Sequence, residues 1–220
     1  LESIPGFRTN LSLEEMQTQI REIGIAMVGQ TEELVPADKR LYSLRDVTGT
    51  VASVPLITSS IISKKGAEGI SSLVLDVKFG RGAFMKDIVK ARELANSLVG
   101  TSNGLGISTI AVLSTMDSPI GNSVGNSVEI LESVEAMCGR GPDDLEELVC
   151  VLGGLLLESE GICEDFTDGA SMIQDSLYDG TALEKFRQMI TAQGGDSSIL
   201  ETDASLMRGL GLLDSGLEST

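Results

Sequence analysis

Two patterns of hydrophobic and polar positions take turns along the chain. Apolar runs of strand length, "SSLVLDVKFG" at 71–80 and "ISTIAVLSTMD" at 107–117, both end in polar residues or glycine. Stretches with helical spacing of apolar residues follow them, over about 85–100 and 127–138. A shorter apolar run, "IGIAMVG" at 23–29, also predicts a buried strand. Strands that alternate with helices favour a parallel or mixed sheet, so we expect an α/β fold with a mixed sheet flanked by helices.

Further helices are predicted on either side of these strands. Ser12 and Glu15 have the spacing of a capping box at the start of a helix with an apolar stripe. The stretch "PADKRLYSLRDVTG" predicts a helix over 36–49, opened by proline and closed by glycine. Another helix is predicted over about 55–65, and the chain after residue 142 has an almost wholly helical pattern.

The charge of the chain excludes two classes of partner. Its 16 Lys and Arg stand against 33 Asp and Glu, which gives a net charge of −17. Phosphate backbones and anionic membrane surfaces would repel such a chain, so we expect neither nucleic acid nor a membrane as partner. Three widely spaced cysteines, Cys138, Cys150 and Cys163, indicate reduced thiols and therefore a cytoplasmic protein.

The chain contains no histidine. This absence excludes, within these 220 residues, a Ser-His-Asp triad, a Cys-His dyad and an HExxH zinc site. Any chemistry must therefore use Arg, Lys, Asp, Glu, Ser, Thr or Tyr.

Four polar side chains lie at helical spacing on the two helices predicted over 36–49 and 55–65. They form two pairs that each share a helix face: Tyr42 with Arg45, and Ser60 with Lys64. An apolar wall that carries cationic donors and hydroxyls suits a flat heterocycle with carbonyl groups, because Arg and Lys donate to carbonyl oxygens. Ile57 and Ile61 flank the second pair and would hold the faces of such a ring.

The alternative is that these side chains are the solvated edge of two core helices. Arg45 would then pair with Asp38 or Asp46. Lys64 would extend its charge to water. Spacing alone favours this alternative, because a tyrosine and an arginine three residues apart form a weak motif.

Two glycine-containing stretches are further candidates. "DVKFGRGAFM" at 76–85 follows a predicted strand, where ligands often bind, but its glycines lack the full dinucleotide pattern, so we expect no nucleotide cofactor. Phe84 in this loop would either cap an apolar pocket or belong to the core, and the pattern slightly favours the core. "GNSVGNSVE" at 121–129 would cap a helix through Asn126 or Ser127, or bind a hard cation with Glu129; caps are far commoner.

Four separated blocks resemble one enzyme family in register and in order. They are "LESIPGF", "LVPADKRLYSLRDVTGTVASVPLITSSIISKK", "LVLDVKFGRGAFMKD" and "GNSVGNSVEILESV". Together they resemble the thymidine phosphorylase and pyrimidine-nucleoside phosphorylase family. The resemblance runs in register to about residue 155 and more loosely to about residue 195.

The resemblance implies a pentosyltransferase that carries out phosphorolysis. Inorganic phosphate, as co-substrate, attacks thymidine or another pyrimidine nucleoside and gives the free base and 2-deoxy-α-D-ribose 1-phosphate, with no organic cofactor. Arg45 and Lys64 would stabilise the negative charge on the departing base, as donors do at an oxyanion hole. The residues matching the family's base contacts are Tyr42, Arg45, Ser60 and Lys64, with the apolar lining Val51, Ile57, Ile61 and Phe84. Glu129 matches an acidic residue that helps to hold a structural monovalent or calcium cation in some members.

The resemblance also implies how the chain is divided. Residues 1–36 and 68–195 would belong to an α/β domain that is incomplete at its N-terminal side, and 37–67 to part of a small helical domain through which homodimers form. Residues 196–220 have weak periodicity and predict a poorly defined tail. The family's phosphate-binding segment is expected upstream of Leu1, so we expect this chain alone to be inactive.

Two alternatives remain at this point. An anthranilate-type phosphoribosyltransferase shares the fold, but it would need acidic magnesium ligands, and the blocks match the phosphorylases better. A non-catalytic truncated product would act by dimerising with a full-length partner. The expected lack of a phosphate-binding segment is the feature that favours it.

Overall fold

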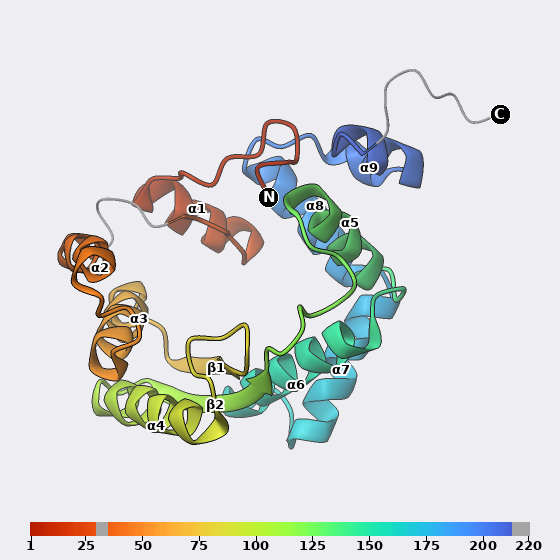
Figure 1. Cartoon of the computed structure of the whole chain (residues 1–220). Helices are drawn as coiled ribbons and strands as arrows, with labels where there is room; N and C mark the ends of the chain where they lie inside the picture. The colour runs from red at the N-terminus through yellow and green to blue at the C-terminus, as the bar shows by residue number, and fades with distance from the viewer. Residues whose placement is uncertain (30–34, 213–220) are drawn as a thin grey trace. The chain divides into compact units, whose positions relative to one another are not determined.

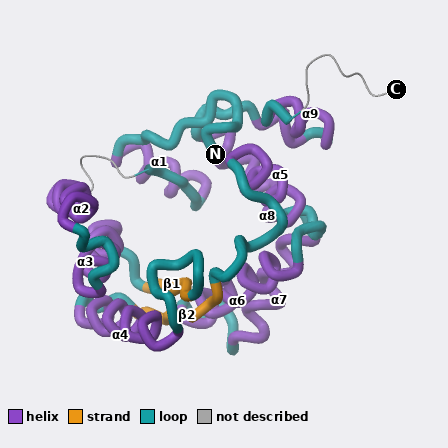
Figure 2. Tube along the Cα trace, viewed as in Figure 1, coloured by secondary structure: helices purple, strands orange, loops and turns teal. Residues whose placement is uncertain are grey.

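The computed structural model describes residues 1–29 and 35–212, and most of these residues are helical (Figure 1). The helices are α1 (Leu13–Ile23), α2 (Pro36–Thr48), α3 (Val54–Glu68), α4 (Ile88–Gly104), α5 (Asn126–Ala136), α6 (Asp143–Ser159), α7 (Phe166–Tyr178), α8 (Thr181–Ala192), α9 (Asp203–Gly209) and the short 3-10 helix η1 (Ser197–Leu200). The strands are β1 (Ser72–Phe79) and β2 (Ser108–Thr115). The α/β class is confirmed, and Figure 2 shows how small a part of the described chain is strand.

The chain divides into two compact units. The first comprises Leu1–Thr31, Gly121–Glu146 and Gln174–Thr220, and the second comprises Glu32–Ile120 and Glu147–Ile173. The division falls inside α6 and α7, so each of these helices contributes residues to both units. No helix within 1–29 or 35–212 is long and apolar enough to cross a membrane.

The second unit is built around a parallel pair of strands. β1 pairs with β2 from Ser72 opposite Ser108 to Phe79 opposite Thr115, and α4 forms the crossover between them. α4 packs on the strands and on α3. The apolar residues of α4 form a core with Ile62 of α3 and Val77 of β1, which are 1% and 5% exposed. The predicted order of strand, helix and strand is therefore confirmed in this unit.

The first unit has a helical core assembled from distant parts of the chain. Ile4 and Phe7, near the N-terminus, are buried against Met189 and Ile190 of α8. α5 lies beside α8 in this unit and contributes Ile130 and Val134 to the same core (Figure 1).

The expectation of a poorly defined tail over 196–220 needs correction. η1 and α9 lie in this segment, and Ile199, Leu206 and Leu210 are buried in the core of the first unit. These helices are held by packing on the rest of the unit, which the weak apolar periodicity of the segment did not reveal. Residues 213–220 of the predicted tail lie outside the described residues.

The predicted strand at 23–29 is wrong. α1 extends to Ile23, and residues 25–29 form no strand. The backbone of this segment bonds instead to a side chain, because the fully buried Gln193 accepts from the Met27 amide at 3.0 Å and donates to the Met27 carbonyl at 2.8 Å. Gly29 donates its amide to the Thr9 carbonyl at 2.8 Å.

The predicted helix boundaries hold where local chemistry sets them. Ser12 and Glu15 form the expected capping box, since each side chain accepts from the backbone amide of the other. Gly49 closes α2 in the left-handed region with φ +65°. The helix predicted over about 55–65 is longer than expected, since α3 continues to Glu68 and ends at Gly69.

Candidate functional site

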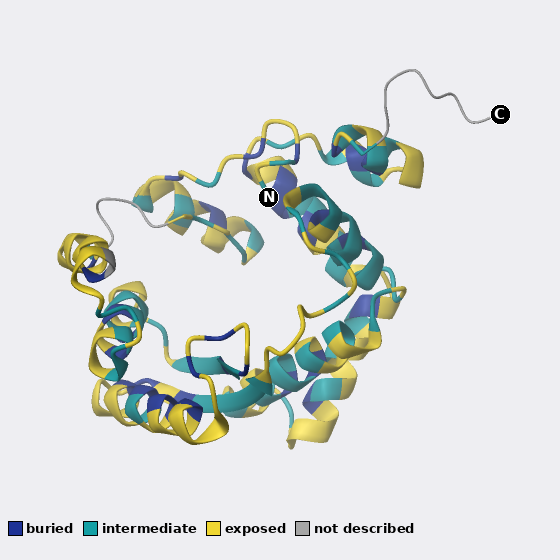
Figure 3. Ribbon diagram, viewed as in Figure 1, coloured by how far each residue is buried: buried dark blue, intermediate teal, exposed yellow. Residues whose placement is uncertain are grey.

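Two prolines and one glycine shape the helices that carry the predicted site. Pro36 and Pro55 lie in the first turns of α2 and α3, where a missing amide hydrogen costs no helical hydrogen bond. The left-handed Gly49 then ends α2 and leads into a short connection. This connection lets α2 pack against α3. Figure 3 shows that α2 is exposed along most of its length.

Arg45 is the buried cation of α2, with 6% of its surface exposed. Its guanidinium donates to the Val51 carbonyl and, at 3.4 Å, to the Leu56 carbonyl. The ring of Tyr42 lies 5.2 Å from the guanidinium carbon, which is within the range of a cation–π contact. The Nε atom of Arg45 is buried and has no hydrogen-bond acceptor among the described residues. The guanidinium is thus fixed in place by backbone carbonyls of α3 and of the connection between α2 and α3.

Lys64 is the half-buried cation of α3. Its ammonium donates to the hydroxyl and the carbonyl of Ser60, both at 2.9 Å. It also forms an ion pair with Asp38 of α2, with 2.5 Å between Nζ and Oδ2. The side chains of Lys64 and Asp38 are 24% and 8% exposed. Lys64 therefore connects the two helices through a charged contact largely removed from water.

Asp38 was predicted from the sequence only as a possible partner of Arg45, and its contact with Lys64 was not predicted. On α2, Asp38, Tyr42 and Arg45 are separated by four and three residues and so share one face. That spacing was the available signal. The solvated-edge alternative, with Lys64 extending to water, does not describe this contact, because the ammonium is bonded to Asp38 and Ser60.

The predicted apolar lining is only partly brought together. Ile57 and Ile61 of α3 are half-buried and pack against the core around Ile62. Val51 is half-buried in the connection between α2 and α3, where its carbonyl accepts from Arg45. The structure therefore shows Val51 in contact with Arg45 through its carbonyl, and Ile57 and Ile61 in contact with the core.

Phe84 is 66% exposed, so the expectation that it belongs to the core is wrong. It lies in the loop between β1 and α4, and Asp117 fixes this loop by accepting from the Arg81 amide at 2.8 Å. Gly80 has φ +117°, and a Cβ atom there would lie 2.6 Å from the Asp117 carboxylate. The backbone of this loop is therefore held in place by Asp117, and the side chain of Phe84 extends from it into solvent.

The cation site at Glu129 stays a prediction. Glu129 accepts from the Gly125 amide at 3.0 Å, and Gly125 rather than Asn126 or Ser127 occupies the N-cap of α5. The expected side-chain cap is therefore wrong. Within 1–29 and 35–212, no group of three or more His, Cys, Asp or Glu could hold a metal ion.

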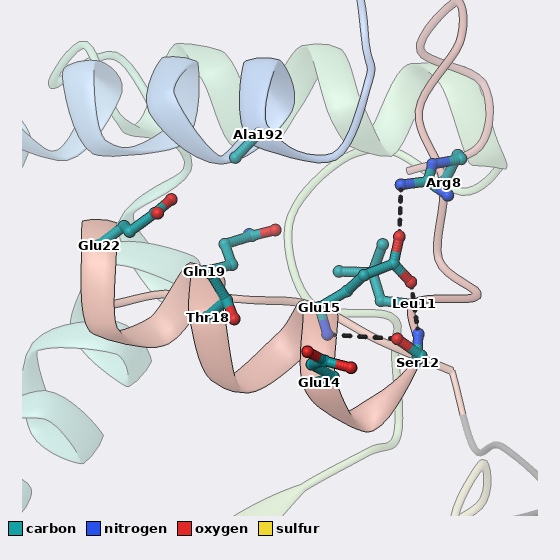
Figure 4. Close-up of a pocket in the computed structure, with 9 residues that line it drawn as sticks. All are labelled: Arg8, Leu11, Ser12, Glu14, Glu15, Thr18, Gln19, Glu22 and Ala192. Carbon is teal, nitrogen blue, oxygen red and sulfur yellow. Dashed lines mark hydrogen bonds and ion pairs between the residues drawn. The ribbon is translucent and has the colours of Figure 1, made fainter.

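A cavity of about 390 Å³ lies in the first unit, and none of the residues predicted to bind the base lines it (Figure 4). Figure 4 shows Glu14, Glu15 and Glu22 of α1 around it, with Arg8 paired to Glu15 at 3.2 Å. Hydrogen bonds from the Ser12 amide, the Ser12 hydroxyl and Arg8 lower the pKa of Glu15. We therefore interpret the cavity as a polar feature of the surface beside the capped start of α1.

Comparison with known proteins decides the family. A family model described as the a/b domain of the glycosyl transferase family matches residues 1–183. The chain belongs to this glycosyl transferase family. The helices from α1 to α7 and both strands lie within the matched residues of the glycosyl transferase domain, and the match ends in the first turn of α8.

The relatives of this glycosyl transferase domain have names that confirm the resemblance seen in the sequence. The chain is 50% identical to a thymidine phosphorylase of Rattus norvegicus over 199 residues, and these residues make up 90% of this chain and 42% of the relative. Over 206 residues it is 43% identical to a pyrimidine-nucleoside phosphorylase of Geobacillus stearothermophilus, covering 94% of this chain and 48% of the relative. The chain thus spans less than half the length of these curated relatives.

Proposed function

We propose that this chain carries the pyrimidine-binding part of a nucleoside phosphorylase, with thymidine as the favoured nucleoside. Inorganic phosphate would attack the sugar, and the products would be the free base and 2-deoxy-α-D-ribose 1-phosphate, with no organic cofactor. The names of the relatives support a pentosyltransferase of this kind. They also favour it over a phosphoribosyltransferase of the anthranilate type.

The observation that carries this proposal is the pair of cations on the facing helices α2 and α3. Arg45 is held by the backbone carbonyls of Val51 and Leu56, and Lys64 is held by Asp38 and Ser60. Ile57 and Ile61 lie half-buried on the same helix as Lys64. Negative charge that develops on the base as the glycosidic bond breaks would be stabilised by such fixed donors. Ser60 and Tyr42 would orient the base, and Val51 and Phe84 would complete its apolar surroundings.

A phosphorolysis assay with thymidine tests the proposal. We expect no turnover from the 220-residue chain and turnover from a longer chain that also carries the flanking segments of these relatives. In that longer chain, Arg45→Ala or Lys64→Ala should lower the rate by about 10²–10³-fold, as loss of one strong electrophilic donor does. Folding should be little affected.

Lys65→Ala is the matched control, because Lys65 is the neighbouring lysine and pairs with Glu68 at 2.9 Å instead. It should turn over like the unaltered protein. Unaltered rates in both Arg45→Ala and Lys64→Ala would return these residues to the solvated edge. Turnover by the 220-residue chain would show that the phosphate-binding groups lie within it.

The remaining properties of the proposed enzyme follow the family resemblance. We propose a cytoplasmic homodimer that forms through a helical domain to which residues 37–67 belong, with 1–36 and 68–195 in the α/β domain. Exposed apolar residues on α2 support an interface there: Leu41, Leu44 and Val47 are 58%, 54% and 80% exposed. A truncated product that only dimerises would show self-association without turnover in either form of the assay.

A further inference from the structure

The ammonium group of Lys64 has three oxygen acceptors in close contact within the chain, two through hydrogen bonds and one through an ion pair. These acceptors are the Asp38 carboxylate, the Ser60 hydroxyl and the Ser60 carbonyl. A pyrimidine carbonyl can therefore bind Lys64 only if one of the three contacts is given up. We propose that Asp38 is the fixed anchor of Lys64 and that the Ser60 hydroxyl is the contact exchanged for the pyrimidine. This inference rests on the proposed function, since it assumes that Lys64 donates to the base.

Asp38 is the contact of Lys64 that is hardest to break. Its side chain is only 8% exposed, and its oxygen lies 2.5 Å from the ammonium. Separating the two charges would leave a carboxylate largely buried without its cation, which is far costlier than losing a neutral hydrogen bond. The ion pair also links α3 to α2. Because Arg45 lies on α2 with Asp38, the ion pair fixes the position of Lys64 relative to Arg45.

The Ser60 hydroxyl is the contact that is easiest to exchange. It is neutral and can both donate and accept, so when Lys64 turns to a ligand the hydroxyl can rotate to a new partner. The Ser60 carbonyl belongs to the backbone of α3, where a helical amide is its ordinary partner. Exchange at the hydroxyl therefore removes a contact from a neutral group and leaves the ion pair intact, which makes Asp38 a positioning residue and the Ser60 hydroxyl the contact that is released.

Arg45 does not share this arrangement. Its guanidinium donates to the backbone carbonyls of Val51 and Leu56. Loss of the Asp38 carboxylate should therefore act on ligand binding through Lys64 and not through Arg45. This difference allows the two cations to serve as internal comparisons.

Thymine affinity of the 220-residue chain gives the first test, measured by calorimetry in a double-mutant cycle. Asp38→Asn should weaken thymine binding by about 10-fold, and this effect should vanish in the Lys64→Ala background but persist in Arg45→Ala. Asp38→Glu keeps the charge and should recover part of the affinity. Glu68→Gln, which removes the partner of the neighbouring Lys65, is the matched control and should bind like the unaltered chain.

An equal loss from Asp38→Asn in the presence and absence of Lys64 would overturn the anchor, because it would assign Asp38 a purely structural role. Absence of any Lys64→Ala effect on thymine binding would overturn the proposed function instead. The two failures are thus distinguishable.

The second test needs no ligand and uses the ¹H–¹⁵N NMR signal of the Lys64 ammonium. In the unaltered chain this signal should persist, because three acceptors protect the hydrogens from exchange with water. It should be lost in Asp38→Asn and retained in Ser60→Ala and Glu68→Gln. Retention in Asp38→Asn together with loss in Ser60→Ala would make the hydroxyl the anchor and refute the proposal.

Discussion

Gln193 offers the sharpest test of how the first unit is held together. Its side chain is fully buried, and its amide group makes four hydrogen bonds. The nitrogen donates to the carbonyls of Arg8 and Met27 at 2.6 and 2.8 Å. The oxygen accepts from the Met27 amide at 3.0 Å and from the Gln19 side chain at 3.2 Å. One side chain thus organises two backbone segments and α1.

Gln193→Leu keeps a similar volume and removes all four hydrogen bonds. A typical hydrogen bond contributes about 1 kcal/mol net, and a buried group left without a partner costs more, so we expect a loss of about 3–5 kcal/mol in the free energy of unfolding. That is a large share of the roughly 5–15 kcal/mol that stabilises an ordinary domain. Urea denaturation followed by far-ultraviolet circular dichroism measures it.

Gln188→Leu, on the helix α8 that Gln193 caps, is the matched control. Among the described residues, the side chain of Gln188 bonds at the exposed surface, donating to Glu184 at 3.4 Å and accepting from Lys185 at 3.2 Å. Its replacement should change the free energy of unfolding by no more than about 0.5 kcal/mol. A loss below about 1 kcal/mol in Gln193→Leu would refute the reasoning, because water would then replace the amide without cost.

Two further outcomes are expected. Gly80→Ala should destabilise the loop before α4 by about 1–3 kcal/mol, since φ is +117° and the new Cβ would meet Asp117. A melting curve like that of Gly100→Ala, where φ is not positive and the new Cβ meets no atom within 4 Å, would contradict this. A hydrogen bond from Arg140 lowers the pKa of Glu135 below its ordinary value of 4.5. The ionised carboxylate therefore stabilises the fold at pH values above 4.5, and this stabilisation is lost as the pH falls through the lowered pKa. Glu135→Gln should therefore flatten the acid side of the stability profile, and an unchanged profile would argue against the ion pair.

Local chemistry was enough to predict many helix ends and both strands. The Ser12 and Glu15 box, Gly49 after α2 and the apolar runs of β1 and β2 each signal their structure within a few residues. The polar pairs on α2 and α3 were found in the same way, because helical spacing alone places them on shared faces.

Features that depend on distant partners could not be predicted. The segment at 25–29 has the composition of a strand, yet its hydrogen-bond partner Gln193 lies 166 residues after Met27. α9 is stabilised by the burial of Leu206 in the core of the first unit, and that core is built from distant parts of the chain. Likewise, Asp38 is recognisable as the partner of Lys64 only once α2 faces α3.

The first unit is assembled from three separate stretches of chain, and this has a consequence for synthesis. Ile4 and Phe7 are made about 180 residues before Met189 and Ile190, against which they pack. The second unit has its α3, β1, α4 and β2 within one continuous stretch and can begin to fold first. Until α8 has been made, the segment that contains Ile4 and Phe7 lacks its packing partners, and its apolar side chains stay exposed. Chaperones would recognise the segment in this state.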